Sequence, residues 1–320
     1  MPLRPERGQA AGSLLLAGAF LLPTAFPQLF SWIGLLLAVP VFLLLQNEEE
    51  ARALRQLRQG LLAAGAAALL LGHGWWFLFL LAAAPLAWTL HRSAQSGADP
   101  AAAGGAGLAV LSGCWLVFWT LRGLLTGVNP YASLLADLDS SLEQLMVIYR
   151  SSGELSGDLL QELELAAAAL RKILPKVLPG LLASSAVFTV WLNLTVSSGL
   201  LRRLRPKQAP WPEYRLWRLP DNLIWLLIAA ALLAMTGAGG LETAGYSLAA
   251  VMLLLYFFQG AAVFAALLCR WNVPVFWRIV LYIFAAAQGC GILLLTVAGA
   301  ADTWADFRKL AQNGQPPSRS

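Results

Sequence analysis

The stretch that decides the fold is AGYSLAAVMLLLYFFQGAAVFAALL, residues 244–268, which contains no Asp, Glu, Lys or Arg. An apolar run of about 20 residues matches the thickness of the hydrocarbon core of a bilayer. Because lipid offers the backbone no hydrogen-bonding partner, such a run is expected to be a helix. This stretch therefore predicts a membrane-spanning α-helix.

Comparable apolar blocks recur along the whole chain, which is 58% hydrophobic and only 12% charged, against about 25% charged in soluble proteins. The strand-like alternation of an outer-membrane barrel is absent. We expect an all-α, polytopic transmembrane helix bundle with eight or nine spans, in a single transmembrane domain over 1–310. The blocks lie at about 11–22, 28–46, 59–72, 75–90, 104–127, 177–200, 219–237, 244–268 and 276–300.

The third and fourth blocks leave an alternative open. Each is short for a full span, and Gly72-His73-Gly74 joins them. They form either a tight hairpin or one long helix followed by a half-inserted segment.

Residues 131–172 differ in composition, because acidic side chains outnumber basic ones there. The run 151–153, Ser-Ser-Gly, interrupts the segment, and Pro175 and Pro179 are expected to mark entry into the next span. We predict two amphipathic helices outside the bilayer core or lying on it. Apolar side chains in the first half of this segment recur at the spacing of one helical face, at Leu138, Leu142, Leu145 and Tyr149.

The polar residues 311–320 are expected to form a disordered tail.

Basic residues predict the orientation, since Lys and Arg are enriched in cytoplasmic loops. They predict a multi-pass protein of the bacterial cytoplasmic (inner) membrane with a cytoplasmic N-terminus. A count of nine spans places the C-terminus outside, whereas the sequence WADFRKL at 304–310 suits the cytoplasm, so its side stays open. The basic residues gather near 4–7, 52–58, 92, 202–218 and 270–278.

The basic segment 202–218 is the densest polar feature. Such clusters beside a span attract anionic lipid. Docking of a membrane or cytoplasmic protein partner is the alternative, and no nucleic-acid partner is expected.

Neither catalytic motifs nor ligand sets are visible. The chain has no HExxH, GxSxG or P-loop sequence, and its three cysteines form no CxxC pair. We therefore expect no enzyme activity, no metal site and no cofactor.

Four polar residues inside apolar blocks are candidates for lining a cavity: Arg122, Asn193, Gln259 and Gln288. A buried arginine in a membrane is costly and points to function, but near a helix end it can extend to the headgroups. The three amides either hydrogen-bond between helices or contact a ligand. Trp residues near the span ends are read as interfacial anchors, with an aromatic stacking pocket as the alternative. These residues are Trp75, Trp76, Trp88, Trp211, Trp217, Trp271 and Trp277.

Four stretches resemble a known family, the YybS-like predicted bacterial membrane proteins, domain of unknown function 2232. They are KVLPGLLASSAVFTVWLNL at 176–194, WRLPDNLIW at 217–225, YFFQGAAVFAALLCRW at 256–271 and GAADTWADFRKL at 299–310. The resemblance implies a multi-span membrane protein and supplies no catalytic residues. Its most specific part is a signature made by Gly299, Asp302, Trp304, Asp306, Phe307, Arg308 and Lys309.

The N-terminal portion is also similar to the substrate-binding subunits of energy-coupling-factor vitamin transporters. Pro23 and VPVFLLL at 39–45 carry that likeness, while Glu48-Glu49-Glu50 departs from the glycine-rich step of those subunits. This similarity implies a small-solute transport or substrate-capture subunit. The alternative is a non-transport scaffold or regulatory protein acting through the basic segment 202–218 and the acidic insert 131–172.

Overall fold

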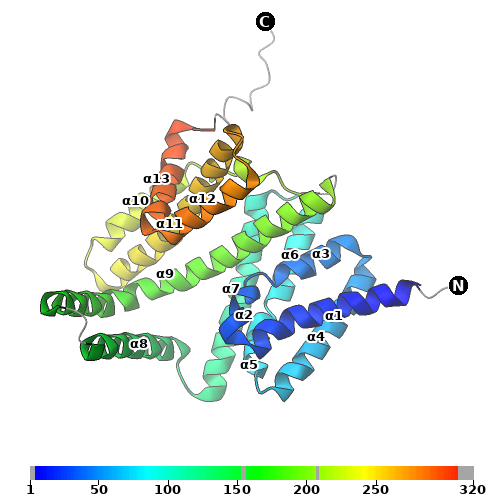
Figure 1. Cartoon of the computed structure of the whole chain (residues 1–320), viewed down its shortest axis with the longest axis horizontal. Helices are drawn as coiled ribbons and strands as arrows, with labels where there is room; N and C mark the ends of the chain where they lie inside the picture. The colour runs from blue at the N-terminus through cyan, green and yellow to red at the C-terminus, as the bar shows by residue number, and fades with distance from the viewer. Residues whose placement is uncertain (1–3, 153–155, 207–208, 309–320) are drawn as a thin grey trace, which may run out of the picture. The chain divides into compact units, whose positions relative to one another are not determined.

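The computed structural model describes residues 4–152, 156–206 and 209–308, whose long regular elements are all α-helices (Figure 1). This confirms the all-α prediction. The expected tail at 311–320 lies outside the described residues. The elements are α1 (Arg4–Ala25), α2 (Pro27–Gly34), α3 (Ala38–Asn47), α4 (Glu50–Leu70), α5 (Gly74–Leu80), α6 (Ala83–Gln95), α7 (Pro100–Thr126), α8 (Pro130–Ser152), α9 (Gly157–Leu204), the 3-10 turn η2 (Tyr214–Leu216), α10 (Leu223–Ala234), α11 (Gly239–Arg270), α12 (Val275–Ala287) and α13 (Gly289–Ala305).

Among the described residues, four helices are long and apolar enough to cross a membrane, or up to six if each of two bent pairs is one span. The four are α5 continued by α6, then α7, α9 and α11; the bent pairs are α2 with α3 and α12 with α13. The expected eight or nine spans are not reached by this measure. The reason is length, because two apolar blocks form only the short helices Gly12–Ala25 and Leu223–Ala234.

Two separate helical segments cover 59–72 and 75–90, and how they insert into the membrane stays a prediction. Block 59–72 contains the second half of α4, and the first half of α4 carries Arg52, Arg55 and Arg58. The chain then turns at Gly72, whose φ of 76° is a left-handed conformation that glycine adopts without strain. It re-enters helix at Gly74, so the two blocks form a hairpin.

The chain divides into two compact units. Unit 1 comprises 1–127 and 186–211, and unit 2 comprises 128–185 and 212–320. Helix α9 contributes to both, with its first part in unit 2 and its last part in unit 1. The expectation of a single transmembrane domain over 1–310 stays a prediction.

In unit 1, α1 packs on α4, α3 on α6 and α6 on α7. Phe20, Phe42 and Leu90 are fully buried in its core. The contact between α1 and α4 is close, because a Cβ on Gly60 would lie 2.9 Å from the Ser13 carbonyl oxygen.

A break in unit 1 separates α2 from α3, whose axes differ by 47°. Pro27 stands in the first turn of α2, where its missing N–H costs no helical hydrogen bond. Residues 35–37 form the bend. Its backbone is not part of a regular helix, so the Leu35 carbonyl oxygen is open to a side-chain donor.

In unit 2 the acidic insert forms two antiparallel helical segments, α8 and the start of α9. Arg171 of α9 contacts Glu143 at 2.6 Å and Asp139 at 2.7 Å, both on α8. Arg150 of α8 contacts Glu164 of α9 at 2.9 Å. The expected two helices are therefore present.

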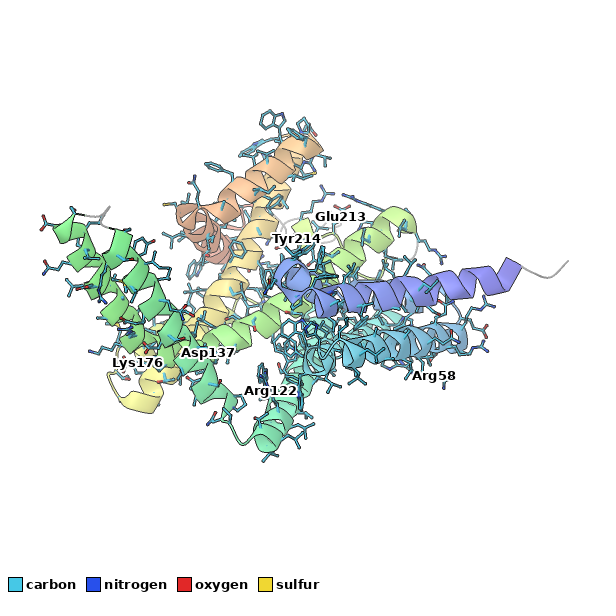
Figure 2. All side chains as sticks on the ribbon, turned by 60° about the horizontal axis from the view of Figure 1, so that its bottom comes forward. Arg58, Arg122, Asp137, Lys176, Glu213 and Tyr214 are labelled. Carbon is cyan, nitrogen blue, oxygen red and sulfur yellow. The ribbon has the colours of Figure 1, made fainter. Side chains whose placement is uncertain are left out.

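Helix α9 continues through Pro175 and Pro179 without a break, so the second insert helix and the apolar stretch after it are one helix. Lys176 of α9, labelled in Figure 2, contacts Glu242 near the start of α11 at 2.6 Å. This ion pair ties α9 to α11 within unit 2.

Helices α10, α12 and α13 complete unit 2 around α11. A Cβ on Gly260 of α11 would lie 1.7 Å from the Leu295 carbonyl oxygen of α13. A Cβ on Gly299 would lie 2.0 Å from the Tyr256 carbonyl oxygen. Only glycine allows α11 and α13 to approach this closely. Helices α12 and α13 meet at 103°, so the block 276–300 is a bent helix pair.

Candidate functional site

Unit 1 contains a cavity of about 140 Å³ at the break between α2 and α3. We call it the unit 1 cavity. Small side chains leave this space open, since Gly34, Ala38, Ala82 and Ala83 all line it. Its complete lining is Ser31, Gly34, Leu35, Ala38, Trp76, Phe79, Leu80, Ala82, Ala83, Leu86, Leu111, Trp115, Thr189 and Asn193.

Asn193 provides the amide of this lining, with 1% of its surface exposed. Its Nδ2 donates to the Leu35 carbonyl oxygen at 2.6 Å and to the Thr189 carbonyl oxygen at 2.8 Å. Both partners are acceptors, which fixes the amide orientation with nitrogen toward them. The Oδ1 atom is buried without a hydrogen-bond partner. An unpaired buried acceptor costs about 1–3 kcal/mol, so a donor that reached this oxygen would be favoured.

Aromatic rings form another wall of the unit 1 cavity. The rings of Trp76 and Phe79 stack with centroids 5.6 Å apart, and those of Phe79 and Trp115 with centroids 5.3 Å apart. The Trp76 indole N–H donates to the Pro23 carbonyl oxygen at 2.9 Å, which holds the ring in place. The lining thus combines a flat aromatic wall with one amide side chain, which favours a small ring-shaped ligand.

Gln259 belongs to a separate polar cluster in unit 2, the buried Asp302 network. Asp302 is fully buried, and its Oδ2 accepts from Arg308 Nη2 at 2.6 Å and from Gln259 Nε2 at 3.3 Å. Its Oδ1 accepts from the Phe307 backbone N–H at 3.1 Å. Gln259 Oε1 in turn accepts from the Leu219 N–H at 3.2 Å. These groups pair the buried charge of Asp302, while Nε of Arg308 is buried without a hydrogen-bond partner.

The same network fixes the segment after α13. Arg308 donates through Nη1 to the carbonyl oxygens of Trp217 at 2.7 Å and Arg215 at 3.0 Å. Residue 308 is therefore held against residues 215 and 217, the part of the basic segment that belongs to unit 2. Both alternatives for the membrane side of the C-terminus stay predictions.

The remaining signature residues divide between packing and surface. Gly299 makes the close contact with α11, and Asp306 takes the left-handed conformation that ends α13, with φ of 38°. Trp304 is 71% exposed and Phe307 46% exposed. Lys309 lies outside the described residues.

Arg122 and Gln288 do not line the unit 1 cavity or join the Asp302 network. Arg122 is exposed near the end of α7 and lies over the Trp119 ring, 5.2 Å from its centroid. It lines a second pocket of unit 1, considered below. Gln288 is exposed at the junction of α12 and α13.

Several arginines of the basic segment bond to other groups of the same chain. Arg202 donates to the Trp211 carbonyl oxygen in unit 1. In unit 2, Arg215 lies 2.5 Å from Glu213, and Arg218 lies 3.0 Å from Asp221. Figure 2 labels Glu213 and Tyr214, which belong to this segment. Lys207 lies outside the described residues.

Sequence reasoning did not single out Thr189, Phe79 or Trp115 as cavity residues, and it read Trp76 chiefly as an interfacial anchor. The available signal was the run of small residues at 82–84 after an aromatic-rich segment. Small residues that lie opposite one another on neighbouring helices leave space. Which residues lie opposite one another depends on how the helices pack, and the sequence alone does not show it.

In a comparison with protein-family models, the chain matches a family described as a predicted membrane protein (DUF2232) over residues 14–303. The comparisons with curated proteins and with solved structures give no match.

Proposed function

The chain belongs to the DUF2232 family of predicted membrane proteins, and on that premise we propose that it captures a small, uncharged solute in the unit 1 cavity. The role is that of a transport-related, multi-pass protein, which we place in the bacterial cytoplasmic membrane. The observation that carries the proposal is the buried Oδ1 of Asn193, an acceptor without a partner on a side chain that lines the cavity.

The volume and lining support a narrow class of ligand. An apolar cavity of about 150 Å³ accommodates a molecule the size of benzene. The unit 1 cavity has about 140 Å³ and is lined mainly by aromatic and aliphatic side chains. The preferred ligand is thus a single ring with one N–H or O–H group that donates to Asn193.

The position of the cavity supports a role in transport. It lies at a bent helix pair, and discontinuous helices form substrate sites in many transporters because they expose backbone carbonyls. Here the carbonyl at the bend is that of Leu35, which accepts a hydrogen bond from Asn193 Nδ2. The side-chain polar groups of the lining are hydroxyls, an amide and indole N–H groups, which supports binding in preference to catalysis.

The test is ligand binding to the full chain in detergent, with phenol as the probe. In Ala83→Leu the added side chain occupies the cavity and leaves Asn193 in place. Ala84→Leu adds the same side chain at the next position of α6, which does not line the cavity. We expect phenol to raise the melting temperature of the wild type and of Ala84→Leu, but not of Ala83→Leu. An equal shift in all three proteins would exclude the cavity as the binding site.

The second candidate function, a scaffold acting through its charged segments, has weaker support. In the acidic insert, Asp139, Glu143 and Glu164 already pair with Arg150 or Arg171. Charges that are paired within the chain are poor determinants of partner choice. Crosslinking in cells that recovers one constant protein partner through either segment would favour the scaffold.

A further inference from the structure

A second pocket, of about 260 Å³, lies in unit 1 at the turn between α4 and α5 and beside the end of α7. We call it the Arg122 pocket. The residues that carry its chemistry are His73, Trp75, Trp76, Phe118, Trp119 and Arg122.

Two nitrogen-bearing side chains of this pocket have bonding capacity that the chain does not use. Arg122 forms no ion pair with a carboxylate among residues 4–152, 156–206 and 209–308, and its guanidinium lies against the Trp119 ring. The Nδ1 atom of His73 is buried and has no hydrogen-bond partner. A planar guanidinium with a second donor nearby matches the geometry of a phosphate group.

The aromatic rings around Arg122 indicate the depth in the bilayer at which this phosphate would lie. Trp75 packs edge-on against Phe118 with centroids 6.2 Å apart, and Phe118 packs against Trp119 with centroids 5.2 Å apart. Clustered Trp side chains are typical of the headgroup level of a bilayer. An apolar floor beneath a cation suits a phosphate that carries an acyl glycerol.

The Arg122 pocket is also separate from the main basic cluster of unit 1. Arg58 lies on the first half of α4, and Gly72 follows that helix, so about 14 residues at 1.5 Å each, roughly 21 Å, separate them. Figure 2 labels Arg58 and Arg122 in well-separated positions. Arg122 is therefore a local cationic site on an otherwise aromatic surface, at the other end of α4.

From these observations we infer that the Arg122 pocket binds a phosphate group, held by Arg122 and His73 over the Trp119 ring. The phosphate is that of a lipid headgroup or a soluble phosphate. This site is independent of the proposed solute cavity, because neither Arg122 nor His73 lines that cavity.

The experiment uses the full chain in detergent with a photoreactive phosphatidylglycerol, followed by peptide mapping of the crosslinks. Wild type is expected to be labelled within 72–79 or 115–122. Labelling there should fall by about tenfold or more in Arg122→Gln, the loss expected for charge-assisted hydrogen bonds. The matched control is Arg203→Gln, which removes an equal charge from the exposed last turn of α9 and should leave this labelling unchanged.

Competition distinguishes the two sources of phosphate. If unlabelled phosphatidylglycerol competes while inorganic phosphate does not, the ligand is a lipid phosphate. If inorganic phosphate also competes, the site takes soluble phosphate as well. If diacylglycerol, which lacks the phosphate, competes as well as phosphatidylglycerol, or if Arg122→Gln is labelled like wild type, the inference is overturned. His73→Gln provides a second variant in case Arg122→Gln fails to fold.

Discussion

The substitution Asp302→Asn tests the buried Asp302 network most severely. Asp302 is fully buried, and the Arg308 side chain bonded to it is only 2% exposed. Asparagine has one acceptor oxygen where aspartate has two, so it cannot serve both Arg308 and the Phe307 N–H. It also leaves the Arg308 charge without its counter-ion.

The expected magnitude follows from this burial. Removing one partner of a buried ion pair costs about 3–5 kcal/mol, because the other charge stays buried and uncompensated. The control is Asp221→Asn, since the Asp221 side chain is 63% exposed and pairs with Arg218 at 3.0 Å. An exposed pair of this kind contributes about 0–1 kcal/mol.

The assay is reversible unfolding of the full chain in mixed micelles, with hydrogen exchange of 299–308 as a local readout. Asp302→Asn should lower the free energy of unfolding by several kcal/mol more than Asp221→Asn, and exchange at 299–308 should rise. The double variant Asp302→Asn/Arg308→Gln should recover part of the loss, with a coupling energy of about 0.5–3 kcal/mol. Equal effects of the two single variants, or no recovery in the double variant, would refute the reasoning.

Two further predictions concern the packing and the charged hairpin of unit 2. In the same unfolding assay, Gly260→Ala should destabilise the protein by about 1–3 kcal/mol, because the added Cβ would collide with the Leu295 carbonyl oxygen. The control is Gly240→Ala on the same helix, where a Cβ has free space and should not destabilise. Similar losses of stability in both variants would contradict the close contact. The hydrogen bond from Arg171 lowers the pKa of Glu143 below its ordinary value of 4.5, so the pair is intact at neutral pH and is lost as the pH falls below that value. Hydrogen exchange of α8 in the wild type should accordingly rise when the pH is lowered through this range. The rise should be smaller in Glu143→Gln, and an equal rise in both proteins would count against this pair.

The class of the fold was predictable because apolar block length is a local property of the sequence. Each apolar block falls on described helices, from Gly12–Ala25 to the bent pair α12 and α13. The way those helices break was not predictable. The Leu35 carbonyl oxygen at the first bend is bonded by Asn193, 158 residues away, and α12 and α13 meet at 103°.

The candidate site was predictable in its residue types and not in its groupings. Asn193, Gln259, Gln288 and Arg122 were grouped only as polar residues in apolar blocks. The structure places Gln259 in the Asp302 network, while Asn193 lines the unit 1 cavity. A polar amide at membrane depth needs a partner, but the sequence does not say which helix provides it.

The central claim is that Asn193 accepts a hydrogen bond from a solute in the unit 1 cavity. The most direct measurement compares the affinities of phenol and toluene, which have nearly the same shape and differ in one O–H donor. The account predicts that phenol binds the wild type about tenfold more tightly than toluene, the value of one buried hydrogen bond. Equal affinities, or binding of neither compound, would contradict it.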